Sequence, residues 1–286
     1  MRKEGLFFLF IFCTLMQLSI YVKAQPPIAK LISKQQWNEL FPNRYAISST
    51  RDGYPITLAK KEFYSYDAFI KAAKKFPQFL SKGTLVQKKR ELASFLANMA
   101  HETSGGWDDA PGGYFAWGLY FLEERGFEKG SSHYSDTSKK KFPPVKNQSY
   151  HGRGPMQLSW NYNYAQFSQF YYCNKNTLLK KPSIVAIDPV VSFASAIWFW
   201  VTPQYPKPSC SEIMRGAWIP EKKDSIAGRL PGFGAVANVI NGGIECGGAV
   251  SVKAGYRLAY YTYFCKYFKV DPGENLACGN QRPFGQ

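Results

Sequence analysis

The sequence predicts a mainly α-helical protein with few short strands, and three observations lead to this expectation. Apolar residues recur at intervals of three and four along several segments, which is the spacing of one helix face. Residues that favour helix N-termini stand directly before some of these segments. Gly- and Pro-rich connections separate the segments at 110–113, 141–155 and 202–208. Such connections commonly carry functional side chains on a rigid scaffold.

Two short helices are expected near the start of the chain. Ser33 and Gln36 fit a capping box, in which each side chain binds the other residue's backbone N–H, at a helix from Gln35 to Phe41. A second helix is expected from Tyr66 to Ala73, where apolar residues lie at helical spacing.

The clearest helix runs from Leu85 to about Thr103, with Leu92, Phe95, Leu96 and Met99 on one apolar stripe before a Gly-Gly pair. Asp188 and Pro189 are a good N-cap and first-turn pair for an apolar helix through Trp200. Further helices are expected near 161–171, 230–240 and 251–268.

The N-terminus resembles a secretory signal. Met1-Arg2-Lys3 precedes an apolar run from Leu6 to Val22, and Ala24 suits cleavage before Gln25. We therefore expect residues 1–24 to be a signal peptide and residues 25–286 to be a secreted, extracellular single domain. A membrane anchor is less favoured, because the run contains polar residues and falls short of the roughly 20 apolar residues that a span needs.

The chain is strongly basic, with a formal net charge of +16. The lysines and arginines are scattered in twos and threes without a nucleic-acid-binding motif, so we expect no nucleic acid partner. Attraction to an anionic cell surface is an equally good explanation of the charge. No stable membrane insertion is expected, and the protein is expected to be a monomer.

Of the six cysteines, Cys13 lies in the signal, which leaves Cys173, Cys210, Cys246, Cys265 and Cys278. Five is an odd number, so at least one cysteine is unpaired or pairs between chains. None of the spacings makes a tight C-x-x-C pair, so zinc is not expected. We expect no metal and no organic cofactor.

Glu102 continues the apolar stripe of the 85–103 helix, since steps from Leu92 reach Phe95, Met99 and then Glu102. Its carboxyl group therefore projects from the buried face at the C-terminal end. Burial and the negative end of the helix dipole both raise a carboxyl pKa, which suits a general acid. A core glutamate paired with an arginine is favoured equally by spacing alone.

Glu124 has a weaker claim to a functional role. It follows Trp117 and Phe121 and precedes Arg125, a pattern that fits a surface ion pair at least as well. Two carboxyl groups are nevertheless what glycosidic cleavage needs, one to protonate the departing oxygen and one to activate water or attack the sugar.

Other chemistries are disfavoured by the motifs. His101-Glu102 lacks the second histidine of a zinc-protease helix, because position 105 is glycine. Gly152-Arg-Gly154 lacks the third glycine of a dinucleotide site. With three histidines and no Gly-x-Ser-x-Gly elbow, nucleophilic acyl transfer is not expected.

The stretch 151–164 places amides and hydroxyls beside tyrosines at a glycine turn, as Gln157, Ser159, Asn161 and Asn163. Neutral sugars need hydrogen-bonding groups for their hydroxyls and aromatic faces for their CH groups. An Asn- and Tyr-rich helix start is the alternative.

Six motifs together resemble the family 19 glycoside hydrolases, the chitinases best known from plants, over about Leu31 to Phe284. They are Phe63-Tyr-Ser-Tyr-Asp-Ala-Phe-Ile70, Ala100-His-Glu-Thr-Ser-Gly-Gly-Trp107, Gly152-Arg-Gly-Pro-Met-Gln-Leu-Ser159, Val191-Ser-Phe-Ala-Ser-Ala-Ile-Trp-Phe-Trp200, Leu230-Pro-Gly-Phe-Gly234 and Val239-Ile-Asn-Gly-Gly-Ile-Glu-Cys246. The resemblance implies a lysozyme-like, bilobal domain with a substrate cleft.

The resemblance also implies an endochitinase that cleaves β-1,4-linked N-acetylglucosamine polymers with inversion. Glu102 would be the general acid and Glu124 the general base, with carboxyl groups roughly 6.5 to 9.5 Å apart and a water held by Ser159 or Ser104. Glu245 and Arg257 would form a charged network with the acid, and this arginine would oppose the effect of burial on its pKa.

The resemblance also implies, by position, a set of substrate contacts and one disulfide. The implied substrate contacts are Trp107, Trp117, Gln157, Tyr162, Asn163, Gln204, Lys207 and Asn241, and the implied disulfide joins Cys246 and Cys278.

The chain also departs from the family pattern. The cysteine usual before Phe63, its partner near Tyr120 and two cysteines around Ser135 are missing. A cleft tryptophan is absent from 130–150, Trp160 replaces a usual histidine, and no cysteine-rich chitin-binding module is present. Two alternatives therefore stay open: action on peptidoglycan or chitosan, and a lectin-like chitin-binding protein without turnover.

Overall fold

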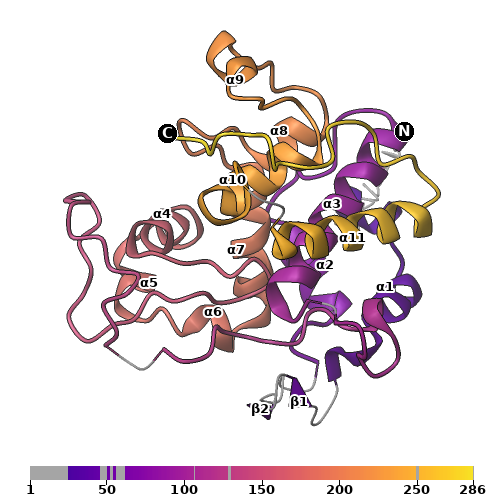
Figure 1. Ribbon diagram of the computed structural model, residues 1–286. Helices are drawn as coiled ribbons and strands as arrows, with labels where there is room; N and C mark the ends of the chain where they lie inside the picture. The colour runs from indigo at the N-terminus through magenta and orange to yellow at the C-terminus, as the bar shows by residue number, and fades with distance from the viewer. Residues whose placement is uncertain are drawn as a thin grey trace, which may run out of the picture.

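The computed structural model describes residues 25–45, 50–51, 54–55, 62–105, 107–127, 130–248 and 251–285. It is mainly helical, which confirms the expected fold class (Figure 1). The predicted signal peptide lies outside these residues. The helices of the described part are all too short or too polar to cross a membrane.

The described elements comprise α-helices, short 3-10 helices and one two-stranded antiparallel pair. The α-helices are α1 (Lys34–Leu40), α2 (Tyr66–Ala73), α3 (Leu85–Thr103), α4 (Asn161–Tyr172), α5 (Asn176–Lys180), α6 (Ile184–Ile187), α7 (Pro189–Val201), α8 (Cys210–Met214), α9 (Lys222–Ile226), α10 (Phe233–Glu245) and α11 (Val252–Tyr267). The 3-10 helices are η1 (Pro27–Lys30), η2 (Pro42–Tyr45) and η3 (Tyr114–Ala116). The strands are β1 (Thr50–Arg51) and β2 (Tyr54–Pro55).

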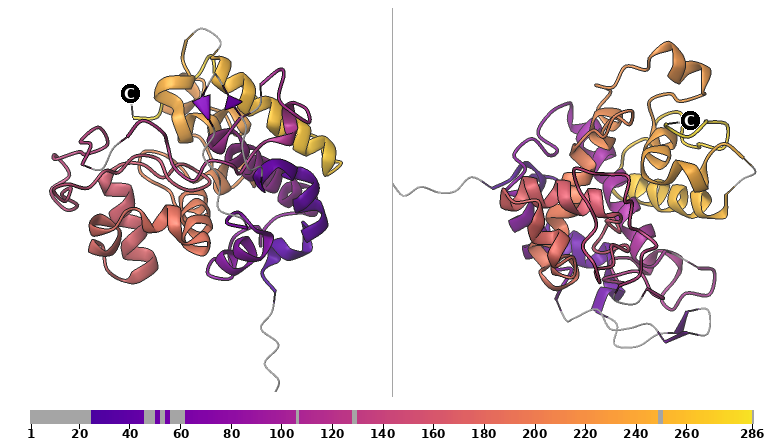
Figure 2. Two further views of the ribbon diagram at one scale, coloured as in Figure 1. Left: turned by 90° about the horizontal axis from the view of Figure 1, so that it is seen from below. Right: turned by 90° about the vertical axis from the view of Figure 1, so that its left-hand side faces the viewer.

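Helix α3 lies at the centre of the molecule. Figures 1 and 2 show α4 to α7 on one side of it and α1 and α11 on the other, and α11 packs most extensively against it. Its apolar stripe Leu92, Phe95, Leu96 and Met99 is fully buried. The stripe that the sequence predicted therefore fixes the direction in which the last turn of α3 presents its side chains.

Capping residues fix several helix starts as the sequence predicts. Ser33 and Gln36 form the expected capping box, although α1 begins at Lys34. The Asp188 side chain accepts hydrogen bonds from the backbone N–H groups of Val190 and Val191 at the start of α7. A second capping box, between Thr84 and Gln87, begins α3.

Helix α10 differs from the helix expected at 230–240, since it begins at Phe233 and ends at Glu245. Gly232 has φ +155°, and a Cβ there would lie 2.4 Å from the Glu274 carbonyl oxygen, so the chain passes this point in a non-helical conformation. Past residue 240 the helix continues across a kink at Asn241, which has φ −143°. The short helices α5, α6, α8 and α9 were not expected, because they hold too few turns to show a period.

A second glutamate of α3, Glu91, is buried in the core with 1% exposure. Trp200 Nε1 donates to its Oε1 at 3.1 Å. Burial raises the pKa of Glu91 from 4.5 to about 7, although Ser211, Trp200 and Arg215 act in the opposite direction. The folded protein therefore binds this proton more tightly than the unfolded chain does.

Glu91→Gln is expected to reduce the amount of unfolding free energy that the protein loses as the pH rises. The raised pKa of Glu91 stabilises the folded protein fully below pH 4.5, the pKa of this group in the unfolded chain. This stabilisation is lost as the pH rises through about 7, its pKa in the folded protein. Between pH 4 and pH 8 the wild type should therefore lose about 3 kcal/mol more unfolding free energy than the variant. Urea unfolding of both proteins at the two pH values measures this difference, and equal losses would contradict it.

Candidate active site

The last turn of α3 places Glu102 against α11. Arg257 Nη2 lies 2.6 Å from Glu102 Oε1, and the Glu102 side chain keeps 18% exposure. The arginine partner that the sequence offered as one alternative is therefore present, and the Glu102 side chain is also partly exposed.

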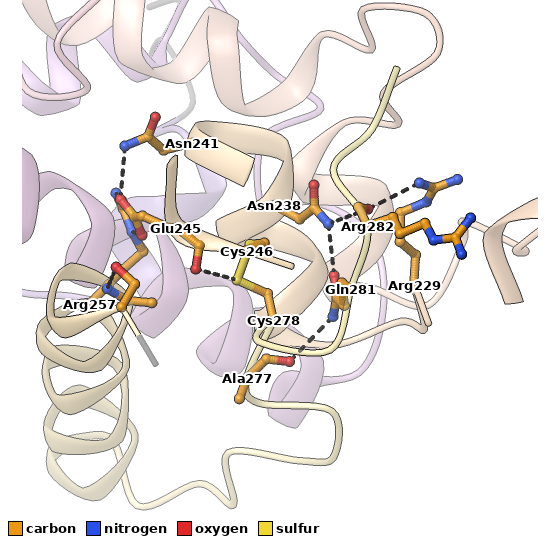
Figure 3. Close-up of a disulfide and its surroundings, with 12 residues drawn as sticks. Arg229, Asn238, Asn241, Glu245, Cys246, Arg257, Ala277, Cys278, Gln281 and Arg282 are labelled. Atoms are coloured by element: carbon orange, nitrogen blue, oxygen red, sulfur yellow. Dashed lines mark hydrogen bonds and ion pairs between the residues drawn. A yellow bond between two sulfur atoms is a disulfide. The ribbon is translucent and has the colours of Figure 1, made fainter. Parts of the chain in front are cut away.

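Arg257 is fully buried and binds three side chains. Its Nε donates to Glu245 Oε2 at 3.0 Å and its Nη2 to Glu245 Oε1 at 2.7 Å. Its Nη1 donates to Asn98 Oδ1 at 2.7 Å. Figure 3 shows the Glu245 carboxylate close to Arg257 and to Asn241 Nδ2, which lies 3.0 Å from Glu245 Oε1.

The charges of this network decide the protonation of Glu102. Burial raises its pKa, the Arg257 charge and hydrogen bond lower it, and the Glu245 charge raises it again. The net direction is upward, which settles the balance that the sequence left open. Burial opposes the charge of Arg257, but Glu102 and Glu245 hold its pKa above the ordinary value.

Backbone hydrogen bonds carry the chain from α3 to Glu124. Leu119 N donates to Thr103 Oγ1 at 2.6 Å, and Phe121 N donates to the Thr103 carbonyl oxygen at 2.8 Å. Farther along, Glu124 N donates to the Gly152 carbonyl oxygen at 2.8 Å. The segment 119–124 therefore joins the end of α3, next to Glu102, to the 152–158 loop.

Glu124 itself accepts hydrogen bonds from Tyr134 and from backbone. Tyr134 Oη donates to Oε1 at 3.0 Å, and Gly152 N donates to Oε2 at 3.2 Å. Burial, this hydrogen bond and the charges of Glu124 and Glu102 raise the pKa of Tyr134 to about 12. The charges of both carboxyl groups therefore act on the Tyr134 hydroxyl group.

Glu123, the residue before Glu124, pairs with two basic side chains. Glu123 Oε2 lies 3.1 Å from both Arg153 Nε and His151 Nε2. The hydrogen bond from His151 is the largest cause of the lowered pKa of Glu123. The Arg125 guanidinium lies 5.2 Å from the centre of the Phe121 ring.

Ser104 and Ser159 differ in how their hydroxyl groups are held. Ser159 Oγ donates to the Gln157 carbonyl oxygen at 2.8 Å. Ser104 is 3% exposed, and its Oγ finds no hydrogen-bond partner within the described part of the chain. A buried hydroxyl group without a protein partner is a suitable position for binding a water molecule or a substrate group.

Trp107 and Trp117 lie together after α3, with ring centres 5.2 Å apart. Trp117 is 2% exposed, and its Nε1 donates to the Pro111 carbonyl oxygen at 2.8 Å. Trp107 is half-buried. The accessible face of the pair therefore belongs to Trp107, and Trp117 supports it from behind.

A cavity of about 460 Å³ contains four of the expected substrate contacts. Its lining includes Tyr162, Asn163, Gln204 and Lys207. Asn163 Oδ1 and Gln204 Nε2 are buried and have no hydrogen-bond partner among the described residues. Asn241, by contrast, joins the Glu245 network.

The expected disulfide between Cys246 and Cys278 is present, directly after Glu245 (Figure 3). Cys173, Cys210 and Cys265 are free. No cluster of His, Cys, Asp and Glu side chains that could hold a metal occurs in the described ranges.

Two residues of this site were missed by the sequence analysis. Asn98 lies one turn before Glu102 on α3 and is fully buried. A polar residue next to the apolar stripe could have indicated a buried hydrogen bond near Glu102. Tyr134 lies in the 130–150 connection, where no periodic pattern indicates which side chain turns toward Glu124.

Comparison with known proteins gives consistent matches. A family model described as "Chitinase class I" matches residues 32–278. Endochitinase A2 of Pisum sativum is 49% identical over 225 residues, which cover 79% of this chain and 67% of that protein. An endochitinase of Carica papaya is 45% identical over 258 residues, 90% of this chain and 100% of that protein.

The matches also include a relative that is named as inactive and a solved structure. Inactive chitinase-like protein 1 of Hevea brasiliensis is 43% identical over 90% of this chain and 77% of its own length. The crystal structure of a family 19, class IV chitinase from Zea mays superposes with a TM-score of 0.62 at 30% identity, covering 87% of this chain and 98% of that one.

Proposed function

The chain belongs to the chitinase class I family of glycoside hydrolases, and on that premise we propose that it is a secreted endochitinase. It hydrolyses internal β-1,4 links of N-acetylglucosamine polymers by inversion, with Glu102 as general acid and Glu124 as general base. Residues 25–286 act as one monomeric catalytic domain after removal of residues 1–24.

The observation that carries this proposal is the different environment of the two carboxyl groups. Glu102 has a raised pKa because of burial, so it keeps a proton for the departing glycosidic oxygen. Glu124 accepts hydrogen bonds from Tyr134 and Gly152, and these donors hold its carboxyl group in place. A carboxylic acid that keeps its proton and a second carboxyl group held in place to activate water are what an inverting glycosidase requires.

Each turnover transfers two protons, one from Glu102 and one to Glu124, and proton exchange with water then restores both groups. Glu102 protonates the glycosidic oxygen as the bond to the anomeric carbon breaks, and Glu124 takes a proton from the water that attacks the opposite face. Ser104 Oγ and Ser159 Oγ help to hold this water. Arg257, 2.6 Å from Glu102 Oε1, stabilises the carboxylate that remains.

Recognition of the N-acetyl group rests on two amide side chains that line the cavity, Asn163 and Gln204. Each amide offers a donor and an acceptor, and the acetamide group presents one of each. Trp107 stacks on a sugar face, while Tyr162, Gln157 and Lys207 bind hydroxyl groups and Asn241 supports Glu245.

A binding protein without turnover is the second candidate function. The Hevea brasiliensis relative named as inactive matches over 90% of this chain, so membership of the family alone does not establish activity. Peptidoglycan and chitosan share the β-1,4 backbone and are rival substrates of an active enzyme.

Incubation of the purified protein with an N-acetylglucosamine hexasaccharide tests the proposal. Internal cleavage gives di-, tri- and tetrasaccharides early in the reaction, which chromatography resolves. Binding by calorimetry without any product would instead establish the lectin-like function. Parallel assays on glycol chitin, chitosan and bacterial cell walls identify the preferred polymer.

Tyr134→Phe is expected to lower kcat by about tenfold with a smaller change in KM. The variant loses the 3.0 Å hydrogen bond that fixes the Glu124 carboxylate, and hydrogen bonds to charged groups contribute roughly 1.5–3 kcal/mol. Steady-state kinetics on the hexasaccharide measure the effect. Tyr66→Phe is the matched control, because it removes a hydroxyl group that binds the Ile32 carbonyl oxygen outside the site. Equal kcat values for both variants would exclude this role of Tyr134.

A further inference from the structure

Glu123, the residue before the proposed base, makes two contacts that the proposed mechanism does not use. Its Oε2 atom lies 3.1 Å from Arg153 Nε and 3.1 Å from His151 Nε2. The side chains of Arg153 and His151 are buried, whereas that of Glu123 is 50% exposed. A half-exposed side chain contributes little packing to the core, so the main effect of these contacts is on the position of the backbone at 122–124.

The backbone at Glu123 runs antiparallel to the backbone at Arg153, and the two residues form an isolated bridge. Backbone hydrogen bonds flank this bridge on both sides, from Glu124 N to Gly152 O and from Gly154 N to Leu122 O. Residues that lie opposite each other in such a pair present their side chains to the same side. The ion pair between Glu123 and Arg153 therefore follows from the backbone pairing and also reinforces it.

The Glu124 carboxylate is bound by the same pair of segments. Glu124 N donates to the Gly152 carbonyl oxygen at 2.8 Å, and Gly152 N donates to Glu124 Oε2 at 3.2 Å. The position of this carboxylate therefore depends directly on the register of 122–124 against 152–154. A bridge of so few residues has little stability of its own, so the contacts of Glu123 are needed to fix that register.

The two groups that bind Glu123 are themselves firmly held. Arg153 Nη1 donates to the Ser149 carbonyl oxygen at 2.9 Å and to Tyr164 Oη at 3.0 Å. Tyr164 Oη in turn donates to the His151 carbonyl oxygen at 2.9 Å. Tyr164 belongs to α4 and is fully buried. Glu123 is therefore bound to an anchor that is fixed to a helix of the core.

Ser149, His151 and Glu123 have the residue types of an acyl-transfer triad, since Ser149 Oγ lies 2.8 Å from His151 Nδ1. Ser149 is only 3% exposed, however, so a substrate carbonyl group cannot reach its hydroxyl group. The hydrogen bond from His151 lowers the pKa of Glu123 and keeps it a carboxylate, which only accepts hydrogen bonds. The three side chains therefore hold one another in place and do not form a nucleophile.

We propose that Glu123 is a positioning residue for hydrolysis, because its carboxylate, held by Arg153 and His151, fixes the backbone register that places the Glu124 carboxylate. The inference rests on the proposed function, since it concerns the base of that reaction. A base that is poorly placed slows the chemical step more than it weakens binding of the substrate. Loss of this contact should therefore lower kcat more than it changes KM.

Two substitutions of Glu123 separate its position from its charge. Both hydrogen bonds end on the single atom Oε2, so the carbonyl oxygen of a glutamine can accept both, whereas alanine accepts neither. Glu123→Ala should lower kcat on the N-acetylglucosamine hexasaccharide by about tenfold, with KM changed by less than about twofold. Glu123→Gln should retain most of the wild-type kcat. Urea unfolding should show lower stability in both variants, because each removes the negative charge beside buried Arg153.

Asp224→Ala is the matched control for the lost ion pair. Asp224 lies on α9, 2.9 Å from Arg229 Nη2, and the Arg229 side chain is 6% exposed, as is that of Arg153. This variant should lose stability and keep the wild-type kcat, since the pair lies outside the candidate site. A loss of kcat equal to that of Glu123→Ala would assign the effect to general destabilisation and overturn the inference.

A double-mutant cycle with Glu124→Ala shows whether the effect passes through the base. Without a carboxylate at position 124, adding Glu123→Ala should lower the residual kcat by less than about twofold, because no base is left to misplace. A fluorescently labelled hexasaccharide makes this residual rate measurable. Unchanged kcat in Glu123→Ala, an equal loss in Glu123→Gln, or a full loss in the Glu124→Ala background would each overturn the inference. Wild-type kcat in Glu124→Ala alone would instead refute the proposed base, so the two failures are distinguishable.

Discussion

Glu102→Gln is expected to lower kcat on the N-acetylglucosamine hexasaccharide by about 10²–10⁴-fold, the range typical of general acid catalysis. Glutamine has the same shape, and its carbonyl oxygen can still accept from Arg257 Nη2, which lies 2.6 Å from Glu102 Oε1. It has no acidic proton to give to the departing oxygen. Oligosaccharide binding should therefore be nearly unchanged while turnover is lost.

Glu91→Gln provides a matched control for this experiment. Glu91 lies on the same helix and is also a buried carboxyl group with a raised pKa. It belongs to a separate contact with Trp200, so the control should retain the wild-type kcat. Normal turnover in Glu102→Gln would remove Glu102 from the role of acid.

Arg257→Met is expected to lower the free energy of unfolding by about 3–5 kcal/mol, as when one partner of a buried ion pair is removed. The Glu245 side chain is 0% exposed and receives two hydrogen bonds from this guanidinium group. Without Arg257 its carboxylate would be buried without a counter-charge. Urea unfolding at constant pH measures the change.

Two further variants identify the cause of this loss. Arg90→Met removes an exposed pair with Asp271 at 3.5 Å and should cost roughly 1 kcal/mol or less. Adding Glu245→Gln to Arg257→Met should restore part of the stability, because the unpaired charge is then absent. A cost in Arg257→Met no larger than in Arg90→Met would refute a buried charge network.

The helices that the sequence predicted well are those with several turns and a clear start. Helix α3 spans Leu85–Thr103 as its apolar stripe indicates, and α7 begins at the Asp188 cap. The 230–240 helix was misplaced, because the close approach of Gly232 to the Glu274 carbonyl oxygen is a contact between distant residues. Such contacts leave no local pattern in the sequence.

The residues of the candidate site were likewise only partly predictable from the sequence. Helical spacing alone placed Glu102 on the buried face of α3, and the structure adds Asn98 one turn earlier through its bond to Arg257. Glu124 could not be placed by spacing, since its position depends on hydrogen bonds with Gly152 and Tyr134. For Arg257, only the family resemblance indicated a link to Glu102.

Proton NMR of the first products of hexasaccharide hydrolysis tests the central claim most directly. If Glu124 activates water while Glu102 protonates the departing oxygen, the new reducing ends form as the α anomer, because attack inverts the β configuration. The α signal should therefore predominate initially and decay toward the equilibrium mixture by mutarotation. Initial predominance of the β anomer would contradict the paired acid and base mechanism.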